Sequence, residues 1–260
     1  MQRVALGTLA ALFFHVLARV SIAGARQNAS PDPATSTLVE RFLSNAGPTL
    51  TSYRAFRTLE AEARGAHTRA RLTAWPTLDP VKGFDYSIVE ETGSGIVRQK
   101  VLHAALEAER SMRTKDQAER GALTPGNYEF APAGTHDGLI RVTIHPKRSD
   151  TMLIEGSILL TDPDADLTRI EGVLIKRPSF WTREVEVERC YERIRGVRVP
   201  VSMRSTARVL IAGRSTFSMA YEYTSINGLA VERPLTESPR LTVRHSPDVR
   251  FRPTTTQPAQ

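Results

Sequence analysis

Apolar and polar residues alternate with a period of two along most of this chain, which is typical of half-buried β-strands. The clearest stretch is 184–192, where glutamates occupy positions 184, 186, 188 and 192. Val185, Val187 and Tyr191 fall on the opposite face of the same segment. The pattern therefore predicts a sheet with one apolar face and one solvated face.

This alternation predicts about ten strands. We expect them at Tyr53–Arg64, Thr68–Leu78, Phe84–Glu91, Tyr128–Ala131, Leu139–His145, Met152–Thr161, Leu167–Ile175, Trp181–Ile194, Val197–Ile211 and Arg214–Ile226. Turn residues such as Asp, Pro and Gly separate most neighbours in the sequence. Strands joined by such short turns pair as an antiparallel meander.

Two segments have helical periodicity instead. Thr37–Ala46 is a short amphipathic stretch that ends at Gly47, and Gly95–Arg113 has an apolar stripe against a charged side. The apolar face of the sheet must be covered, and these helices are the only candidates. The predicted fold class is therefore α+β, with a large curved antiparallel sheet, an open half-barrel, closed by a few α-helices.

The ends of the chain differ from its body. Residues 1–25 combine Arg3, an apolar run from Val4 to Ala18 and the small residues Ala23-Gly24-Ala25, which predicts a cleaved export signal and a mature start at Arg26. The alternative is an uncleaved anchor, although the run is shorter than the ~20 residues that span a bilayer. We expect a linker at 26–36, one domain at 37–233 and a disordered Pro-rich tail at 234–260.

The overall charge suggests nucleic acid at first sight, because the 260 residues carry a formal charge of +7. The segment 26–233, however, contains 29 basic and 26 acidic residues, so much of the excess lies in the two ends. The body has no concentrated basic footprint. We therefore expect no nucleic-acid partner.

Signals of catalysis and of metal binding are missing from the sequence. The single cysteine, Cys190, excludes an internal disulfide and a zinc site built from several thiolates. The histidines occur singly, and no nucleophile elbow or phosphate-binding glycine loop is present. Asp162–Asp166 is read as a hairpin turn, since it lacks the spacing of a calcium loop. We expect no enzyme activity, no cofactor and no metal.

Three segments give the chain a resemblance to a known family. Met152–Asp164 is a strand followed by an Asp-containing turn, Leu167–Gly172 has an R-I-E-G core, and Lys176–Trp181 has a P-S-F-W corner. Over residues 37–228 the chain resembles the LolA/LolB superfamily of periplasmic lipoprotein carriers and its relatives among outer-membrane lipoprotein-sorting proteins. The resemblance implies an apolar cavity between the half-barrel and its helices that takes acyl chains. It also implies a buried arginine that ties the helical lid shut, which the sequence alone does not assign to a position.

The residues themselves also favour such a cavity, because Met and aromatic side chains gather on the apolar strand faces and suit ligands of loose shape. The expected lipid-binding residues are Trp75, Val101, Ala105, Trp181, Val201, Met203, Phe217, Met219, Tyr221 and Tyr223. The same stripes are also typical of plain core. Arg189 and Arg193 lie on the apolar face of their strand. One interpretation is that they pair with an anionic head group or with acidic residues of a helix. The other, which we favour slightly, is that this end of the strand has emerged into solvent.

These observations lead to two hypotheses for the function. The first is a soluble, monomeric periplasmic carrier or binder of a lipid or of the acyl chain of a lipoprotein, with no catalysis. The alternative is an envelope sensor or interaction module that uses the same fold to bind an inner- or outer-membrane protein. No cysteine lies near the predicted cleavage point, so we do not expect a lipid anchor on the mature N-terminus.

Overall fold

A computed structural model describes residues 33–45, 47–63, 68–111, 119–176, 182–209 and 213–232. Within these residues, eleven strands form a single antiparallel sheet in the order β3-β2-β1-β10-β9-β8-β7-β6-β5-β4, and a short β11 pairs with β10. The strands are β1 (Tyr53–Ala63), β2 (Arg69–Asp79), β3 (Gly83–Gly93), β4 (Tyr128–His136), β5 (Leu139–Pro146), β6 (Ile154–Leu160), β7 (Leu167–Leu174), β8 (Thr182–Ile194), β9 (Val197–Val209), β10 (Gly213–Ile226) and β11 (Leu229–Ala230).

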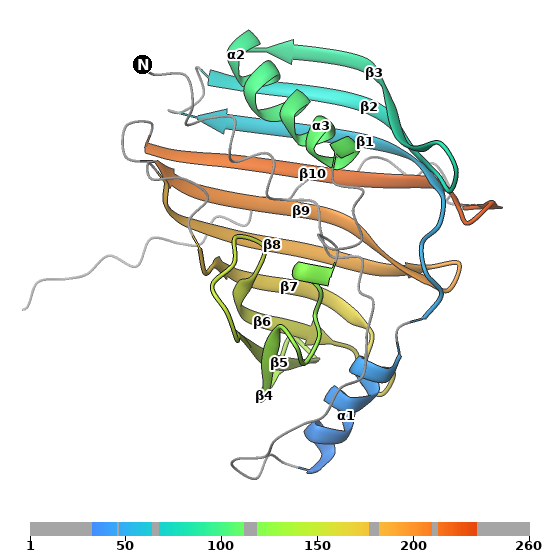
Figure 1. Ribbon diagram of the computed structural model, residues 1–260, viewed down its shortest axis with the longest axis vertical. Coiled ribbons are helices and arrows are strands. Elements are labelled where there is room, and N and C mark those ends of the chain that lie inside the picture. The colour runs from blue at the N-terminus through green and yellow to red at the C-terminus, as the bar shows by residue number, and fades with distance from the viewer. Residues whose placement is uncertain are drawn as a thin grey trace, which may run out of the picture.

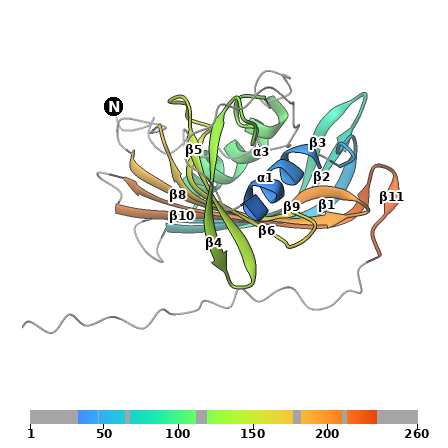
Figure 2. The same ribbon diagram turned by 90° about the horizontal axis from the view of Figure 1, so that it is seen from below.

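The helices lie on one side of this sheet, as Figure 2 shows for α1 and α3. Helix α1 spans Pro33–Ser44, and a second helical unit consists of α2 (Gly95–Val97), a π-helical turn η3 (Arg98–His103) and α3 (Ala104–Ser111). The predicted α+β class with an open antiparallel sheet and a few helices is confirmed. No helix within the described ranges is long and apolar enough to cross a membrane.

The two faces of the sheet are chemically distinct. In β1, the buried Tyr53, Ala55 and Leu59 alternate with more exposed residues, and the same period runs through β8 and β10. We call the face that carries these buried side chains the inner face, and the face of Glu184 and Glu186 the outer face. The inner face and the helices share one hydrophobic core.

The predicted strands and helices are present with small shifts at their ends. Helix α1 begins at Pro33 rather than Thr37, which suits a proline because the first turn of a helix needs no backbone N–H donor. It therefore takes up the last residues of the predicted linker. The predicted export signal, residues 26–32 and the tail from 234 lie outside the described residues.

The connection between the two halves of the sheet differs from a simple meander. β1–β3 and β4–β10 are each meanders, and they join where β1 pairs with β10. The first and last long strands therefore lie side by side in the interior of the sheet, and β3 and β4 form its two edges (Figure 1). Local patterning does not reveal this pairing, because the two partners lie far apart in the chain.

Candidate functional site

The middle of the inner face is lined by β8, β9 and β10. The register places Phe217 of β10 opposite Ser205 of β9, and Met219 opposite Met203. Tyr221 continues the same face and lies opposite Arg57 of β1. These side chains are almost fully buried, so the apolar face predicted from the alternation of β10 is present.

The structure brings most of the predicted site residues together. On the inner face of the sheet lie Met203, Phe217, Met219, Tyr221 and Tyr223, all in the core. Ala105 belongs to the same core from α3, and the half-buried Val101 of η3 packs against it. Val201 is half-buried at a bulge of β9 opposite Cys190 and Tyr191. Trp181 lies outside the described residues.

Trp75 is the exception and does not join this group. Its ring packs edge-on against Phe56, with ring centroids 5.1 Å apart, and the Arg54 guanidinium lies 4.9 Å from the Trp75 centroid. Alternation along β2 explains this position, because Leu72 and Ala74 are the residues that point inward. The expectation that Trp75 lines the interior is therefore corrected, and Trp75 lies on the outer face.

The helices cover the two ends of the inner face separately. The unit α2-η3-α3 packs on β1–β3, whereas α1 lies at the other end and contacts β4 (Figure 1). The strands with Met203, Phe217 and Met219 lie between these two helical elements. The two helical elements therefore attach to the sheet independently of each other, and the centre of the apolar face lies between them. We call these two helical elements the covers.

A buried ion pair connects α3 with the sheet. The Arg57 guanidinium is fully buried, and its Nη1 donates to Glu109 Oε2 at 2.5 Å. The Tyr53 hydroxyl donates to Glu109 Oε1 at 2.8 Å and accepts from Arg57 Nη2 at 3.0 Å. The guanidinium also stacks 4.5 Å from the centroid of the Tyr221 ring. One network thus links β1, β10 and α3.

Burial disfavours the charged forms of Arg57 and Glu109, and each of the two charges favours the charged form of the other. Burial acts to lower the pKa of Arg57, but the Glu109 carboxylate raises it well above its usual range, so the guanidinium is charged. Burial raises the pKa of Glu109, while Arg57 acts in the opposite direction. Sequence reasoning did not single out this arginine. The sequence feature that could have identified it is its place in the alternation of β1, because Arg57 occupies a position on the same face as Ala55 and Leu59, where an apolar residue is expected.

A second ionic cluster attaches α1 to the far end of the sheet. Asp166, in the turn before β7, accepts from Arg193 Nε at 2.7 Å and from Arg198 Nη2 at 3.4 Å. The Arg198 guanidinium lies 5.3 Å from the ring centroid of Phe42 of α1. The hydrogen bond from Arg193 is the main cause that holds the pKa of Asp166 below its ordinary value. Arg193 therefore pairs with a turn carboxylate rather than with a helix acid.

Arg189 has a different environment from the one that we favoured. It is 5% exposed, so the expectation that this end of β8 emerges into solvent is wrong for Arg189. It lies opposite Met203 of β9 and Ile170 of β7 on the inner face. The side chain is buried because it lies on the inner face, between the core residues Met203 and Ile170.

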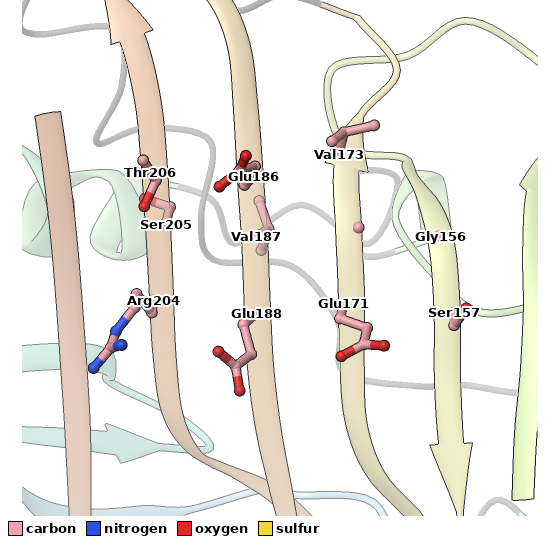
Figure 3. A pocket seen from close by; sticks show the side chains of 11 residues that line it. Gly156, Ser157, Glu171, Val173, Glu186, Val187, Glu188, Arg204, Ser205 and Thr206 are labelled. Atoms are coloured by element: carbon pink, nitrogen blue, oxygen red, sulfur yellow. The ribbon is translucent and has the colours of Figure 1, made fainter. Parts of the chain in front are cut away.

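A shallow hollow of about 460 Å³ lies on the outer face of β6–β9 (Figure 3). Its border includes the carboxylates of Glu171, Glu186 and Glu188 and the guanidinium of Arg204. Along β8, Glu186 and Glu188 alternate with the buried Val185 and Val187, so they point away from the helices. The register places Glu171 of β7 and Arg204 of β9 opposite Glu188 on the same face. This hollow is not the apolar space expected between sheet and helices.

The described residues also show no arrangement for metal binding. Among them, no group of three or more His, Cys, Asp or Glu side chains is placed to hold an ion. Cys190 is a free, half-buried thiol on the strand of the outer-face glutamates. The notable polar groups of the described inner face are instead arginines and tyrosines.

Comparison with known proteins returns solved structures alone. No known protein family and no curated protein matches the sequence. A DUF1329 family protein from Desulfovibrio piger aligns at 10% identity with a TM-score of 0.34, over 74% of this chain and 92% of that one. An outer membrane lipoprotein-sorting protein domain from Vibrio parahaemolyticus aligns at 9% identity and a TM-score of 0.35, with the same coverage of 74% and 92%.

A LolA superfamily protein from Nitrosomonas europaea aligns at 10% identity with a TM-score of 0.32, over 76% of this chain and 94% of that one. All three alignments thus have at most 10% identity and a TM-score below 0.5.

Proposed function

We propose that this protein is an exported carrier or binder of a lipid, or of the acyl chain of a lipoprotein, and that it catalyses no reaction. The ligand lies between the inner face and the helices. The observation that carries the proposal is the group Met203, Phe217 and Met219, which lies between two separately attached helical covers. Methionine and aromatic side chains adapt to flexible acyl chains.

Binding requires the covers to move, because the side chains of this group are 5% exposed or less. The bonds between α3 and β3 are suited to opening. Tyr86 donates to Glu107 at 2.5 Å, and Arg110 Nη2 pairs with Asp85 at 2.6 Å, both at the exposed rim. Exposed pairs of this kind contribute only about 0–1 kcal/mol each. The rim contacts therefore add little to the cost of separating α3 from β3, whereas the buried pair of Arg57 and Glu109 opposes this opening more strongly.

The proposed site of action is the periplasm. The pattern of residues 1–25 supports export to the periplasm, with Arg26 as the first residue of the mature protein. We propose that it acts there as a monomer that shields acyl chains from water. N-terminal sequencing of the exported protein tests the predicted start at Arg26.

Native mass spectrometry of protein purified from the periplasm tests the function, together with titration of a fluorescent fatty acid. We expect copurified lipid and saturable binding. Met219→Asp places a charge in the centre of the inner face and abolishes binding. Glu186→Ala, on the outer face, leaves binding unchanged. Wild-type protein without copurified lipid or fatty-acid binding would contradict the proposal.

A second candidate is an interaction module for a membrane protein, and the edge strand β3 favours it. Ile88 and Val89 of β3 are 39% and 56% exposed, and the neighbouring Ile96 is 72% exposed. Apolar side chains beside an unpaired strand edge are typical of protein-binding surfaces. Crosslinking in whole cells separates the two candidates, because a stoichiometric membrane-protein partner without lipid favours the module.

A further inference from the structure

Arg189 lies in the middle of an otherwise apolar row that crosses the inner face. On one side the row passes through Met203 of β9, and on the other through Ile170 of β7. The register extends it strand by strand through Leu72, Leu59, Met219, Ile158 and Val142. Every member of the row is 5% exposed or less. A single guanidinium thus interrupts an apolar band across eight strands.

Within the described residues, this guanidinium lacks a counter-charge. No described carboxylate lies within 4.0 Å of Arg189, whereas Arg57 pairs with Glu109 and Arg198 with Asp166. The Nε of Arg189 is buried and has no hydrogen-bond partner. Because arginine does not deprotonate in proteins, Arg189 keeps a buried positive charge. Such a charge is strongly unfavourable unless an anion accompanies it.

Three neutral phenols of the inner face lie close enough for the charge of Arg189 to act on them. Burial raises the pKa of Tyr128, Tyr191 and Tyr221, and the charge of Arg189 opposes this rise in each of them. These hydroxyls are therefore protonated at physiological pH and offer no negative charge. They do offer donors and acceptors around a bound anion.

The adjoining part of the inner face also has an excess of positive charge. Arg193 and Arg198 share the single carboxylate of Asp166, and two nitrogens of Arg198, Nε and Nη1, are buried without a partner. Tyr191 lies between the two regions, since the charges of both Arg189 and Arg198 act on its hydroxyl. This end of β8 and β9 thus favours a negatively charged group.

We propose that Arg189 binds the anionic group, a carboxylate or a phosphate, of an amphipathic ligand whose acyl chain lies along the apolar row. A guanidinium binds either group through two parallel hydrogen bonds, which gives both affinity and orientation. Tyr191 donates to the same group. The proposal rests on the proposed function, and it adds selectivity for acidic over neutral lipids.

The test is a competition assay on the full exported chain, with cis-parinaric acid as the fluorescent probe below its micelle concentration. Palmitate, hexadecyl phosphate and hexadecanol serve as competitors of equal chain length. We expect the two anionic compounds to displace the probe at concentrations at least about tenfold below that of hexadecanol, which is the factor expected for about 1.4 kcal/mol. Inorganic phosphate without a chain displaces nothing, which separates a lipid head group from a free anion.

Arg189→Met keeps the length and the apolar character of the site but removes its charge. We expect this variant to lose the tenfold preference while it still binds hexadecanol. Arg204→Met is the matched control, because Arg204 lies exposed on the outer face of the neighbouring strand β9, and it keeps the preference. If Arg189→Met does not fold, Arg189→Lys replaces it and reduces the preference, since ammonium lacks the paired geometry.

The outcomes distinguish this inference from the proposed function. Equal binding of palmitate and hexadecanol by the wild-type protein overturns the role of Arg189 and leaves a lipid carrier. An unchanged preference in Arg189→Met, with a lowered melting temperature, shows a structural role and also overturns the inference. Failure of every chain-bearing compound to bind overturns the proposed function itself.

Discussion

Arg57 and Glu109 show how single residues connect the layers of this protein. The two side chains lie on β1 and α3, and their 2.5 Å contact is almost entirely removed from water. Breaking such a pair costs more than the pair itself contributes, because the remaining charge stays buried. The effect of a substitution therefore depends on which partner remains.

Glu109→Gln leaves the Arg57 guanidinium without its counter-charge. We expect it to lower the free energy of unfolding by about 3–5 kcal/mol, as measured by urea denaturation at pH 7. The double variant Arg57→Met/Glu109→Gln recovers part of this loss. Glu60→Gln is the control, because its pair with Arg71 is exposed, and it changes stability by less than about 1 kcal/mol. A similar loss in both single variants would contradict a special role of the buried pair.

Asp166 gives the protein a predicted acid sensitivity. Its pKa in the folded state lies below the ordinary value of 3.8, chiefly through the hydrogen bond from Arg193. A lowered pKa stabilises the fold above the unfolded-state pKa, and this contribution disappears as the pH falls through the folded-state value. Asp166→Asn should therefore cost about 1–3 kcal/mol at pH 7, and this cost should shrink as the pH falls from 7 to well below 3.8.

Urea denaturation of the wild type and of Asp166→Asn across this pH range measures the difference. Glu184→Gln, on the exposed outer face, serves as the control and follows the wild-type curve. A difference between wild type and Asp166→Asn that stays constant with pH would exclude the carboxylate as its source.

The helical unit α2-η3-α3 is the element whose attachment matters most for the proposed function. Besides the buried pair, polar contacts join it to β3. Glu91 binds both Arg98 at 2.6 Å and His103 at 2.7 Å, and Tyr86 and Asp85 bind residues of α3. Burial and the contact with Glu107 raise the pKa of Tyr86 to about 12, so this bond persists across the physiological range.

Removal of the rim contacts should loosen this unit without unfolding the protein. For Tyr86→Phe/Arg110→Ala we expect amide hydrogen exchange in α3 to become at least about threefold faster, because each lost contact is worth a few tenths of a kcal/mol. The melting temperature stays close to the wild-type value. Arg69→Ala, which removes an exposed pair with Glu62 on β1, is the matched control and leaves exchange in α3 unchanged.

Local patterns predicted the elements well, and their partners poorly. The glutamates of β8 and the aromatic residues of β10 lie on the faces that alternation assigns to them, because burial of one face dictates the period. Trp75 shows where this reasoning fails. It is a large apolar residue, but it lies on the outer face of β2 and packs there against Phe56. The ion pairs Arg57–Glu109 and Arg193–Asp166 join segments that lie far apart in the sequence, so a short stretch of sequence cannot predict them.

At the scale of the whole molecule, the sheet lies within residues 53–230, and the buried core that it shares with the helices lies within residues 38–226. A fragment of residues 33–232 should therefore fold on its own, with a melting temperature within a few degrees of that of the chain from residue 26 to residue 260. It should also bind cis-parinaric acid with unchanged affinity. Circular dichroism and fluorescence titration measure both properties. A clear loss of either would show that residues 26–32 or 233–260 belong to the domain.

The pairing of β1 with β10 has a consequence for the order of folding. Two meanders, β1–β3 and β4–β10, can each assemble from neighbouring strands, but the seam between them closes only when β10 is available. Contacts between such distant segments form late and slow the folding of a domain. A nascent chain consequently cannot close this seam until nearly all of its residues have emerged from the ribosome, so the proposed export would begin on a chain that is still unfolded.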